Sequence, residues 1–297
     1  GIEVETIEFG KRAPVDPTKV VERLAADKAH DIKAVLFTHV DTASSTLSDT
    51  KAVRAAMDEA GHPALFMADC IASLACDRFE MADAGVDVMV AGSQKGLMTP
   101  PGMCFVFYNA KADARRDTAN CATGYWDWRP RTDAEALYLY FYGTAPTHHL
   151  YGLREALDMI LEEGLEEVYR RHEVLAEMVW IAGEAWSSTG PLALNISDRA
   201  ARSRAVTTFM LPQPQTVALR AWTEKNTGVT LGLGLGMDPD DGSPQVDLFR
   251  IGHMGHLDPQ MLFGALSSVD SALKSLQIPH GSGALEQVSE FLAYNGG

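Results

Sequence analysis

The segment DVMVAGSQKGLMTPPGMCF (Asp87–Phe105) places a single lysine, Lys95, between a hydrophobic run and a turn rich in glycine and proline. A lysine at the end of a strand usually extends its amine into water, so the residue alone indicates little. The apolar runs Val86–Gly92 and Met103–Asn109 on either side have the length of strands. The connection through Pro100–Gly102 is too short for a crossover helix, so we predict that the second of these strands runs antiparallel to the first.

Two further apolar runs precede this segment, at Ala34–Val40 and Ala64–Cys70. Helical patterns over Pro17–Asp27 and Asp49–Ala60 alternate with them. Short, continuously apolar strands separated by helices are typical of a mostly parallel sheet that is covered on both faces. The sequence therefore predicts an α/β protein.

The second half of the chain has a different pattern of predicted helices and strands. The stretch Thr147–Trp186 has a helical pattern that Gly164 is expected to divide into two helices. Shorter elements follow it: strands at Ala205–Leu211 and Asp247–Gly255, and helices at Gln215–Thr227, Pro259–Leu276 and Leu285–Tyr294. We predict a large domain over residues 1–186 and a smaller α+β C-terminal domain over residues 187–297.

The composition of the 297 residues is that of a globular protein, with 46% hydrophobic and 22% charged residues. No apolar run reaches the length of a membrane span, and the first residues show no signal-peptide pattern. The four cysteines occur singly, without CxxC spacing, which indicates reduced packing residues in a cytoplasmic protein and no metal site. A net charge of −15 disfavours nucleic acid or an anionic membrane as a partner.

Polar side chains follow each of the three predicted parallel strands. The first strand is followed by His39, Asp41 and Thr42, the second ends at Asp69, and the third leads to Ser93, Gln94 and Lys95. Ligands of open α/β sheets bind at the carboxyl ends of strands. A lysine can form a Schiff base with an aldehyde, and an aspartate can keep a pyridine nitrogen protonated, so the set suits pyridoxal 5′-phosphate. Simple structural roles compete with this interpretation, because Asp69 could cap a turn and Thr42 could cap a helix.

Several motifs in one order resemble the class V aminotransferases of pyridoxal-phosphate fold type I, in particular the serine–glyoxylate and alanine–glyoxylate branch. The motifs are GSQKGLMTPPG (Gly92–Gly102), ADCIASL (Ala68–Leu74), FRIGHMG (Phe249–Gly255), YWDW (Tyr125–Trp128), LYGLREAL (Leu150–Leu157) and IPHGSGALE (Ile278–Glu286). The resemblance implies that Lys95 is the Schiff-base lysine, that Asp69 is the partner of the pyridine nitrogen, and that Arg250 holds the α-carboxylate of the substrate. It also implies cofactor contacts by Gln94 and Ser93 near the phosphate, Ile71 under the ring, Thr42 near the ring hydroxyl, and Thr144 at the phosphate of the neighbouring subunit in a homodimer with shared active sites.

The chain also departs from the family pattern. Ser45 stands where the family usually has a glycine, so we expect the loop around Thr42 to be shaped differently. Phe141 replaces a tyrosine of some relatives. His148 and His149 replace apolar or amide residues, and they are expected either to pack at a helix N-terminus or to contact a polar group of the amino donor. The family's N-terminal segment, with its glycine-rich phosphate loop and its ring-stacking aromatic residue, has no counterpart here, so the large domain is expected to be incomplete in this sequence.

The resemblance implies transamination from a small amino acid to glyoxylate, with serine as the first choice of donor and aspartate or alanine as alternatives. A cysteine desulfurase or kynureninase-like hydrolase on the same fold is a second possibility, but desulfurases typically carry histidine where Gln94 stands, and no cysteine here has a suitable context. Gln94 also argues against an enzyme of the pyridoxamine–pyruvate type. A non-catalytic module on the same scaffold is the third possibility, against which the presence of Lys95, Asp69 and Arg250 argues.

Overall fold

The computed structural model describes residues 2–132, 134–237 and 246–295. Its first sheet contains four strands in the order β1-β4-β5-β6: β1 (Ala34–Thr38), β4 (Leu65–Asp69), β5 (Val88–Gly92) and β6 (Cys104–Tyr108). The first three are parallel, and β6 is antiparallel to β5, which confirms the direction predicted from the short connection. A small hairpin, β2 (Val40–Asp41) with β3 (Thr46–Leu47), extends from the end of β1.

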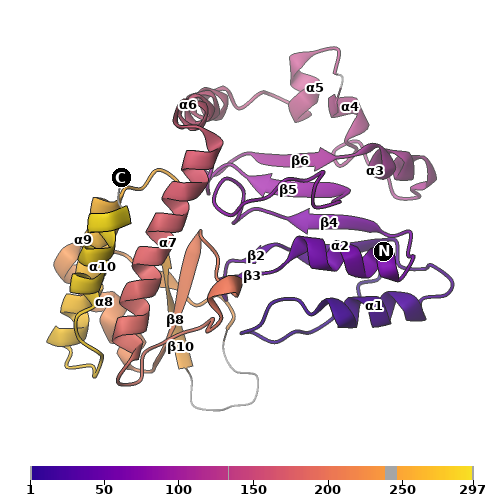
Figure 1. The fold of residues 1–297 in the computed structure, drawn as a ribbon. Helices are drawn as coiled ribbons and strands as arrows, with labels where there is room; N and C mark the ends of the chain where they lie inside the picture. Colours follow the sequence, from indigo (N-terminus) through magenta and orange to yellow (C-terminus); the bar gives the residue numbers. More distant parts are fainter. Residues whose placement is uncertain (1, 133, 238–245, 296–297) are drawn as a thin grey trace.

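Helices α1 (Pro17–Ala26) and α2 (Thr50–Glu59) cover one face of this sheet (Figure 1). Each begins at an aspartate whose carboxylate accepts a backbone N–H of the first turn. Their apolar side chains pack with Phe37 and Phe66 in one buried cluster. The other face differs from the prediction at β1, because Leu36 is 79% exposed and no described helix covers it.

Beyond β6 the chain forms a region that we call the aromatic lobe (residues 110–132 and 134–146), seen at the right (α3) and at the top (α4 and α5) of Figure 1. It contains α3 (Ala110–Arg115), the 3₁₀ turn η1 (Arg116–Thr118), α4 (Arg129–Thr132) and α5 (Leu137–Phe141). Two long helices follow, α6 (Thr147–Glu163) and α7 (Leu165–Ser187). They meet at Gly164, whose φ of +88° favours glycine, so the predicted break is confirmed.

The C-terminal region forms a second, antiparallel sheet in the order β7-β8-β10-β9. Its strands are β7 (Ala193–Leu194), β8 (Val206–Pro212), β10 (Val246–Gly252) and β9 (Gly232–Leu233), with the 3₁₀ turn η2 (Arg199–Ala201) before β8. Helices α8 (Gln215–Thr227), α9 (Pro259–Ser275) and α10 (Ala284–Asn295) pack with it. The buried cluster of this region includes Trp186, Phe209 and Phe249, and it extends into α7 from Leu175 onward. The α7 helix therefore contributes to the C-terminal core, and the boundary at residue 186 stays a prediction.

No helix among the described residues combines the length and apolarity needed to cross a bilayer.

Candidate active site

The three parallel strands end at one edge of the first sheet, where their following loops meet. The backbone N–H of His39 donates to the Asp69 carbonyl at 3.0 Å, and the N–H of Cys70 donates to the Val90 carbonyl at 2.9 Å. These bonds continue the sheet past the last strand residues and hold the loops side by side. The edge therefore gathers the polar residues that the sequence places after each strand, as expected for an open α/β sheet.

Asp69, Ile71 and Gln94 lie around Gly92 at this edge. The Asp69 carboxylate accepts the Ile71 backbone N–H at 2.9 Å. A Cβ atom at Gly92 would stand 2.9 Å from Gln94 Oε1 and 3.5 Å from Ile71 Cγ2, so both side chains close on the glycine. The Ile71 and Gln94 side chains are exposed. The structure thus brings together a carboxylate, an apolar side chain and an amide, three of the residues singled out from the sequence.

Arg250 and Thr42 meet at the junction of the two sheets. Arg250 lies on β10, and its guanidinium donates from Nε to the Leu233 carbonyl at 2.6 Å and from Nη1 to the Thr42 carbonyl at 2.9 Å. Burial lowers the pKa of Arg250, and the nearby Asp41 carboxylate opposes that effect. Within the described part of the chain, Arg250 has no carboxylate ion pair. A half-buried guanidinium that carbonyls orient is well suited to bind a planar carboxylate.

Lys95 follows β5 in a tight turn. Its side chain is partly buried, and its amine has no hydrogen bond or ion pair with any described residue. The turn is closed by the Met98 N–H, which donates to the Lys95 carbonyl at 3.0 Å, and Met98 itself has a φ of +61°. Left-handed backbone at a residue other than glycine is uncommon and gathers at functional sites. The turn therefore presents an unpaired amine from a rigid backbone.

Gly96 packs directly against the loop that follows Asp69. A Cβ atom at Gly96 would stand 2.1 Å from the Leu74 carbonyl oxygen and 2.9 Å from Cys76 Sγ. No side chain fits into this contact, so only glycine allows the lysine turn to approach the neighbouring loop so closely. This explains the glycine that follows Lys95 in the sequence.

Other predicted site residues lie in different surroundings. Ser93 is fully buried, and its hydroxyl donates to the Pro100 carbonyl at 3.1 Å. His149 donates from Nε2 to the Pro101 carbonyl at 3.1 Å and packs on the same turn. Thr144 and His148 are exposed, and neither side chain has a hydrogen bond with a described residue. Among the described residues, no hydrogen bond joins any of these four side chains to Asp69 or Lys95, and their roles in cofactor or substrate binding stay predictions.

The sequence led us to expect a differently shaped loop after β1, but at Ser45 the backbone keeps the conformation that favours glycine. Ser45 has a φ of +63°, the left-handed conformation that glycine adopts at no cost. The Ser45 hydroxyl accepts the Thr208 backbone N–H at 3.1 Å, and the Thr208 hydroxyl donates to the Ala43 carbonyl at 2.9 Å. The serine thus keeps the turn and adds a hydrogen bond to β8.

A buried aspartate makes a second connection between the two sheets, and no motif in the sequence indicated it. Asp77 accepts the Ser203 hydroxyl at 3.0 Å and the Arg204 backbone N–H at 3.0 Å. Burial raises the pKa of Asp77, and its hydrogen bonds to Arg204 oppose the shift. Together with Ser45 and Thr208, Asp77 fixes the loops of the first sheet against β8. Only long-range contacts reveal these roles, since serine, threonine and aspartate are common in any loop.

The parallel sheet, the unpaired lysine after its third strand, the aspartate at the end of the second and the added antiparallel sheet define the pyridoxal-phosphate-dependent transferase fold of type I. Solved structures of this fold superpose on the chain. The pyridoxamine–pyruvate aminotransferase of Mesorhizobium loti is 25% identical with a TM-score of 0.81, over 94% of this chain and 69% of that one. The ureidoglycine–glyoxylate aminotransferase of Bacillus subtilis is 23% identical with a TM-score of 0.79, over the same shares.

The chain belongs to the class-V aminotransferase family, whose sequence model matches residues 1–234. It is similar to the serine–glyoxylate aminotransferase of Methylorubrum extorquens, with 36% identity over 98% of this chain and 71% of the relative. It is also similar to the Arabidopsis thaliana enzyme of the same name, with 35% identity over 88% of this chain and 63% of the relative. The L-aspartate–glyoxylate aminotransferase of Paracoccus denitrificans is 34% identical over 94% of this chain and 68% of the relative. The chain thus spans 63–71% of the length of these three relatives.

Proposed function

We propose that the protein binds pyridoxal 5′-phosphate at Lys95 and transfers the amino group of a small amino acid, serine first, to glyoxylate. The products are glycine and the 2-oxo acid of the donor. The observation that carries this proposal is the unpaired Lys95 amine at the same sheet edge as the Asp69 carboxylate, together with the Arg250 guanidinium that has no acidic partner among the described residues. Relatives named for serine–glyoxylate transamination support the choice of substrates.

The donor set fits the cofactor. When bound, pyridoxal phosphate supplies an electron sink that stabilises negative charge at the donor's Cα. In the proposal, the Asp69 carboxylate keeps the ring nitrogen protonated, the Ile71 side chain packs under the ring, and the Thr42 side chain binds near the ring hydroxyl. The Gln94 amide binds the phosphate with Ser93 beside it, and the bond of the Ser93 hydroxyl to the Pro100 carbonyl holds the turn.

In the proposal, residues of this chain also bind the substrate and transfer the proton. The Lys95 amine would move a proton at the donor's Cα, because it stands free of any described partner at the sheet edge where the substrate binds. The Arg250 guanidinium binds the α-carboxylate of both donor and acceptor through N–H groups that Leu233 and Thr42 leave unused. The same arginine thus orients both substrates in turn.

Thr144 supports the proposal of a homodimer with shared sites. It is exposed beside the exposed side chains of Tyr140 and Tyr142, so it is available to a second subunit. In the proposal its hydroxyl binds the phosphate in the partner's site. Sedimentation of the loaded protein should give a dimer, and full activity in a monomer would contradict this part of the proposal.

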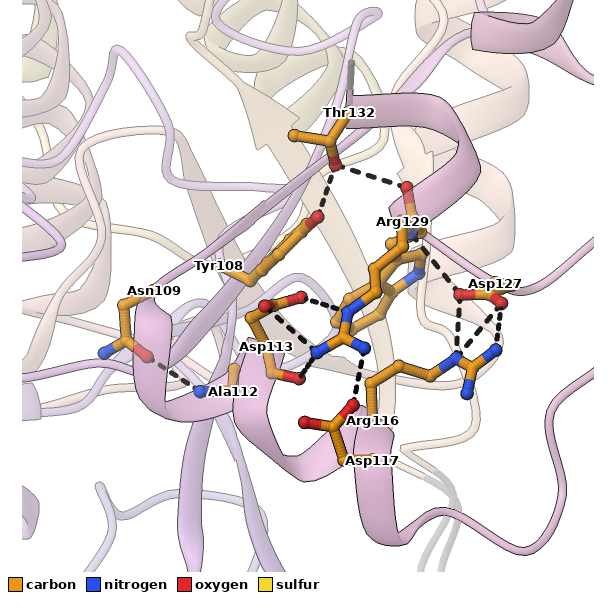
Figure 2. Close-up of polar contacts among 10 residues, drawn as sticks. Tyr108, Asn109, Ala112, Asp113, Arg116, Asp117, Asp127, Arg129 and Thr132 are labelled. Carbon is orange, nitrogen blue, oxygen red and sulfur yellow. Dashed lines mark hydrogen bonds and ion pairs between the residues drawn. The ribbon is translucent and has the colours of Figure 1, made fainter. Parts of the chain in front are cut away.

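The choice of serine over aspartate rests on the partners of the arginines that a second carboxylate could use. A second carboxylate needs its own cation, since an unpaired charge in a dry pocket costs several kcal/mol. Arg129 is already bound by the carboxylates of Asp113 and Asp117 (Figure 2). The Arg131 guanidinium stacks over the rings of Tyr125 and Tyr142. These engagements favour the uncharged donors serine and alanine.

The central test replaces Lys95 with alanine. The purified wild type should show a visible absorption band that borohydride abolishes, and Lys95→Ala should lack both the band and transamination. Lys225→Ala, at an exposed position on α8, is the matched control and should behave as the wild type. Normal turnover in Lys95→Ala would overturn the proposal.

The substrates are tested with one panel. Serine, alanine and aspartate are each combined with glyoxylate and with pyruvate, and kcat/KM is compared. Serine with glyoxylate should give the highest value. Activity with aspartate far above serine, lost in His148→Ala, would overturn the choice of donor, and a failure of all three donors to form glycine would overturn the choice of glyoxylate.

A further inference from the structure

A buried histidine on α7 has both ring nitrogens occupied by backbone groups. His172 Nε2 lies 3.0 Å from the Gly255 backbone nitrogen, and His172 Nδ1 lies 2.7 Å from the Val168 carbonyl oxygen. A backbone N–H can only donate and a carbonyl can only accept, so Nε2 is the acceptor and Nδ1 carries the proton. Burial lowers the pKa of His172 to about 4, which agrees with a neutral ring.

Gly255 is the residue that this histidine holds, and α7 holds it at two atoms. The Gly255 carbonyl accepts Nη1 of Arg171 at 2.6 Å, while its N–H donates to His172. Arg171 is itself oriented by an ion pair with Glu163 at 2.7 Å. The φ of Gly255 is +88°, a conformation that strains any other residue. The peptide groups on both sides of Gly255 are therefore fixed to the helix.

Gly255 in turn lies against the backbone of Lys95. A Cβ atom at Gly255 would stand 3.4 Å from the Lys95 carbonyl oxygen. On its other side, the lysine turn contacts Leu74 and Cys76 through Gly96. The Lys95 backbone is thus enclosed between the Leu74–Cys76 loop and Gly255. We call this arrangement the lysine clamp: Leu74–Cys76, Ser93–Thr99, His172 and Gly255.

The same strand end also carries Arg250, five residues before Gly255. Between them, His253 is fully buried and fixed by the Arg204 carbonyl at 3.0 Å and the Thr207 hydroxyl at 2.9 Å. Trp180 of α7 donates to that hydroxyl at 3.2 Å. The segment from Arg250 to Gly255 is therefore held against α7 at both His253 and Gly255.

We propose that His172 is a positioning residue, which sets the place of the Lys95 amine relative to Arg250 by accepting the Gly255 N–H. The role rests on the proposed function, in which the lysine and the arginine act on one substrate. His172 does not touch the substrate. Its loss frees Gly255, and with it the surface against which the Lys95 turn rests.

Two variants of His172 separate the effect of its hydrogen-bond acceptor from the effect of the rest of its side chain. His172→Gln keeps a polar atom at the distance of Nε2, so the Gly255 N–H retains an acceptor. His172→Asn reaches only as far as Nδ1, so it retains the bond to Val168 and loses the bond to Gly255. Both variants keep a polar amide on α7, so a difference between them reports on the Gly255 hydrogen bond.

The first readout needs no cofactor. Amide hydrogen exchange at Gly255 and Gly96 should be at least about tenfold faster in His172→Asn than in the wild type and close to the wild type in His172→Gln, since an unsatisfied buried N–H strongly favours opening. Exchange on α10, remote from the clamp, is the internal control. Unchanged exchange at Gly255 in His172→Asn would overturn the proposal.

The second readout uses the loaded enzyme. His172→Asn should lower kcat by about tenfold or more, with the visible absorption band of the bound cofactor altered, and His172→Gln should restore most of the loss. Equal losses in both variants, or wild-type turnover and band in His172→Asn, would overturn the positioning role. If the wild type itself bound no cofactor at Lys95, the proposed function would fail, while the exchange measurement would still decide whether His172 holds the turn.

Discussion

Different interactions hold the lysine clamp and the aromatic lobe together: buried neutral hydrogen bonds in the clamp, and surface ion pairs in the lobe. In the clamp, His172 is buried and neutral, and it is held by backbone groups at 2.7 Å and 3.0 Å. In the lobe, arginines and aspartates pair at the surface, as between Arg129 and Asp117 at 2.6 Å (Figure 2). Burial penalises charge and favours neutral hydrogen bonds, whereas exposed ion pairs are screened by water. Substitutions in the clamp should therefore lower the stability of the protein strongly, and substitutions in the lobe should change it little.

The lobe also leaves aromatic surface uncovered, which the clamp does not. Trp126 is 75% exposed and Tyr125 is 57% exposed. Exposed apolar surface of this kind is typical of a protein-binding face, in agreement with the proposed dimer. The lysine turn is thus completed by contacts within the chain, whereas the aromatic side chains of the lobe stay exposed.

Acid should disrupt the clamp before the lobe. Burial lowers the pKa of His39 and of His172 to about 4, and that of His253 to about 3. The unfolded chain protonates these histidines near their ordinary pKa of about 6.5, so the unfolded state binds more protons as the pH falls below that value, and stability is lost between about pH 6.5 and 4. The effect is roughly 3 kcal/mol for each histidine, and Asp77, whose pKa is raised, acts in the opposite direction.

The measurement is urea unfolding at pH 7.5, 6, 5 and 4.5. Asp117 and Asp127 of the lobe have their pKa lowered by arginine and stay ionised throughout this range. His256→Asn, at an exposed position, is the control and should leave the profile unchanged. A flat stability profile from pH 7.5 to 4.5 would show that the buried histidines do not limit the stability of the fold.

Gly96→Ala tests the packing of the clamp. Its new methyl group would stand 2.1 Å from the Leu74 carbonyl oxygen, and neither backbone can give way without moving Lys95. We expect a loss of roughly 3 kcal/mol in the free energy of unfolding, together with weaker cofactor binding. Gly264→Ala on α9, where a Cβ meets nothing within 4 Å, should instead stabilise the protein by about 0.5–1 kcal/mol. Equal stability of the two variants would contradict the packing described for the lysine turn.

At Ser45, two variants measure separately the cost of the left-handed backbone and the contribution of the hydrogen bond. Ser45→Ala keeps the φ of +63° and loses the acceptor for the Thr208 N–H, so it should destabilise the protein by about 1–3 kcal/mol. Ser45→Gly loses the same acceptor but relieves the left-handed strain, so it should be about 1 kcal/mol more stable than the alanine variant. Urea unfolding of both variants measures the difference, and an alanine variant as stable as the wild type would show that the hydrogen bond contributes nothing.

The smallest effect is expected in the lobe. Arg129→Ala removes the ion pairs with Asp113 and Asp117, all three of which are exposed to water. The melting temperature should change by no more than about 2 °C, while limited proteolysis within residues 116–132 becomes faster because the lobe loosens. Arg154→Ala, which removes an exposed pair on α6, is the control for loss of a surface charge. A large fall in melting temperature for Arg129→Ala alone would mean that the lobe is part of the stable core.

Much of the fold could be predicted from local pattern. The apolar runs, the aspartate caps and the break at Gly164 are properties of neighbouring residues, and the short connection at Pro100–Gly102 determined the direction of β6. The polar residues after each strand were predictable for the same reason, because parallel strands end at one edge. The gathering of Asp69, Gln94 and Lys95 at that edge therefore followed from the sequence.

Only the tertiary structure decided how this edge is held. The bonds of His172 to Gly255 and of Ser45 to Thr208 join residues 83 and 163 positions apart. The sequence around His172 or Ser45 does not indicate whether the residue is buried, because its hydrogen-bond partner lies on a distant segment of the chain. The sequence by itself determined which chemical groups stand at the site, because strand order follows from local pattern. Their tautomers, backbone strain and fixed positions arise from long-range packing, which no local pattern records.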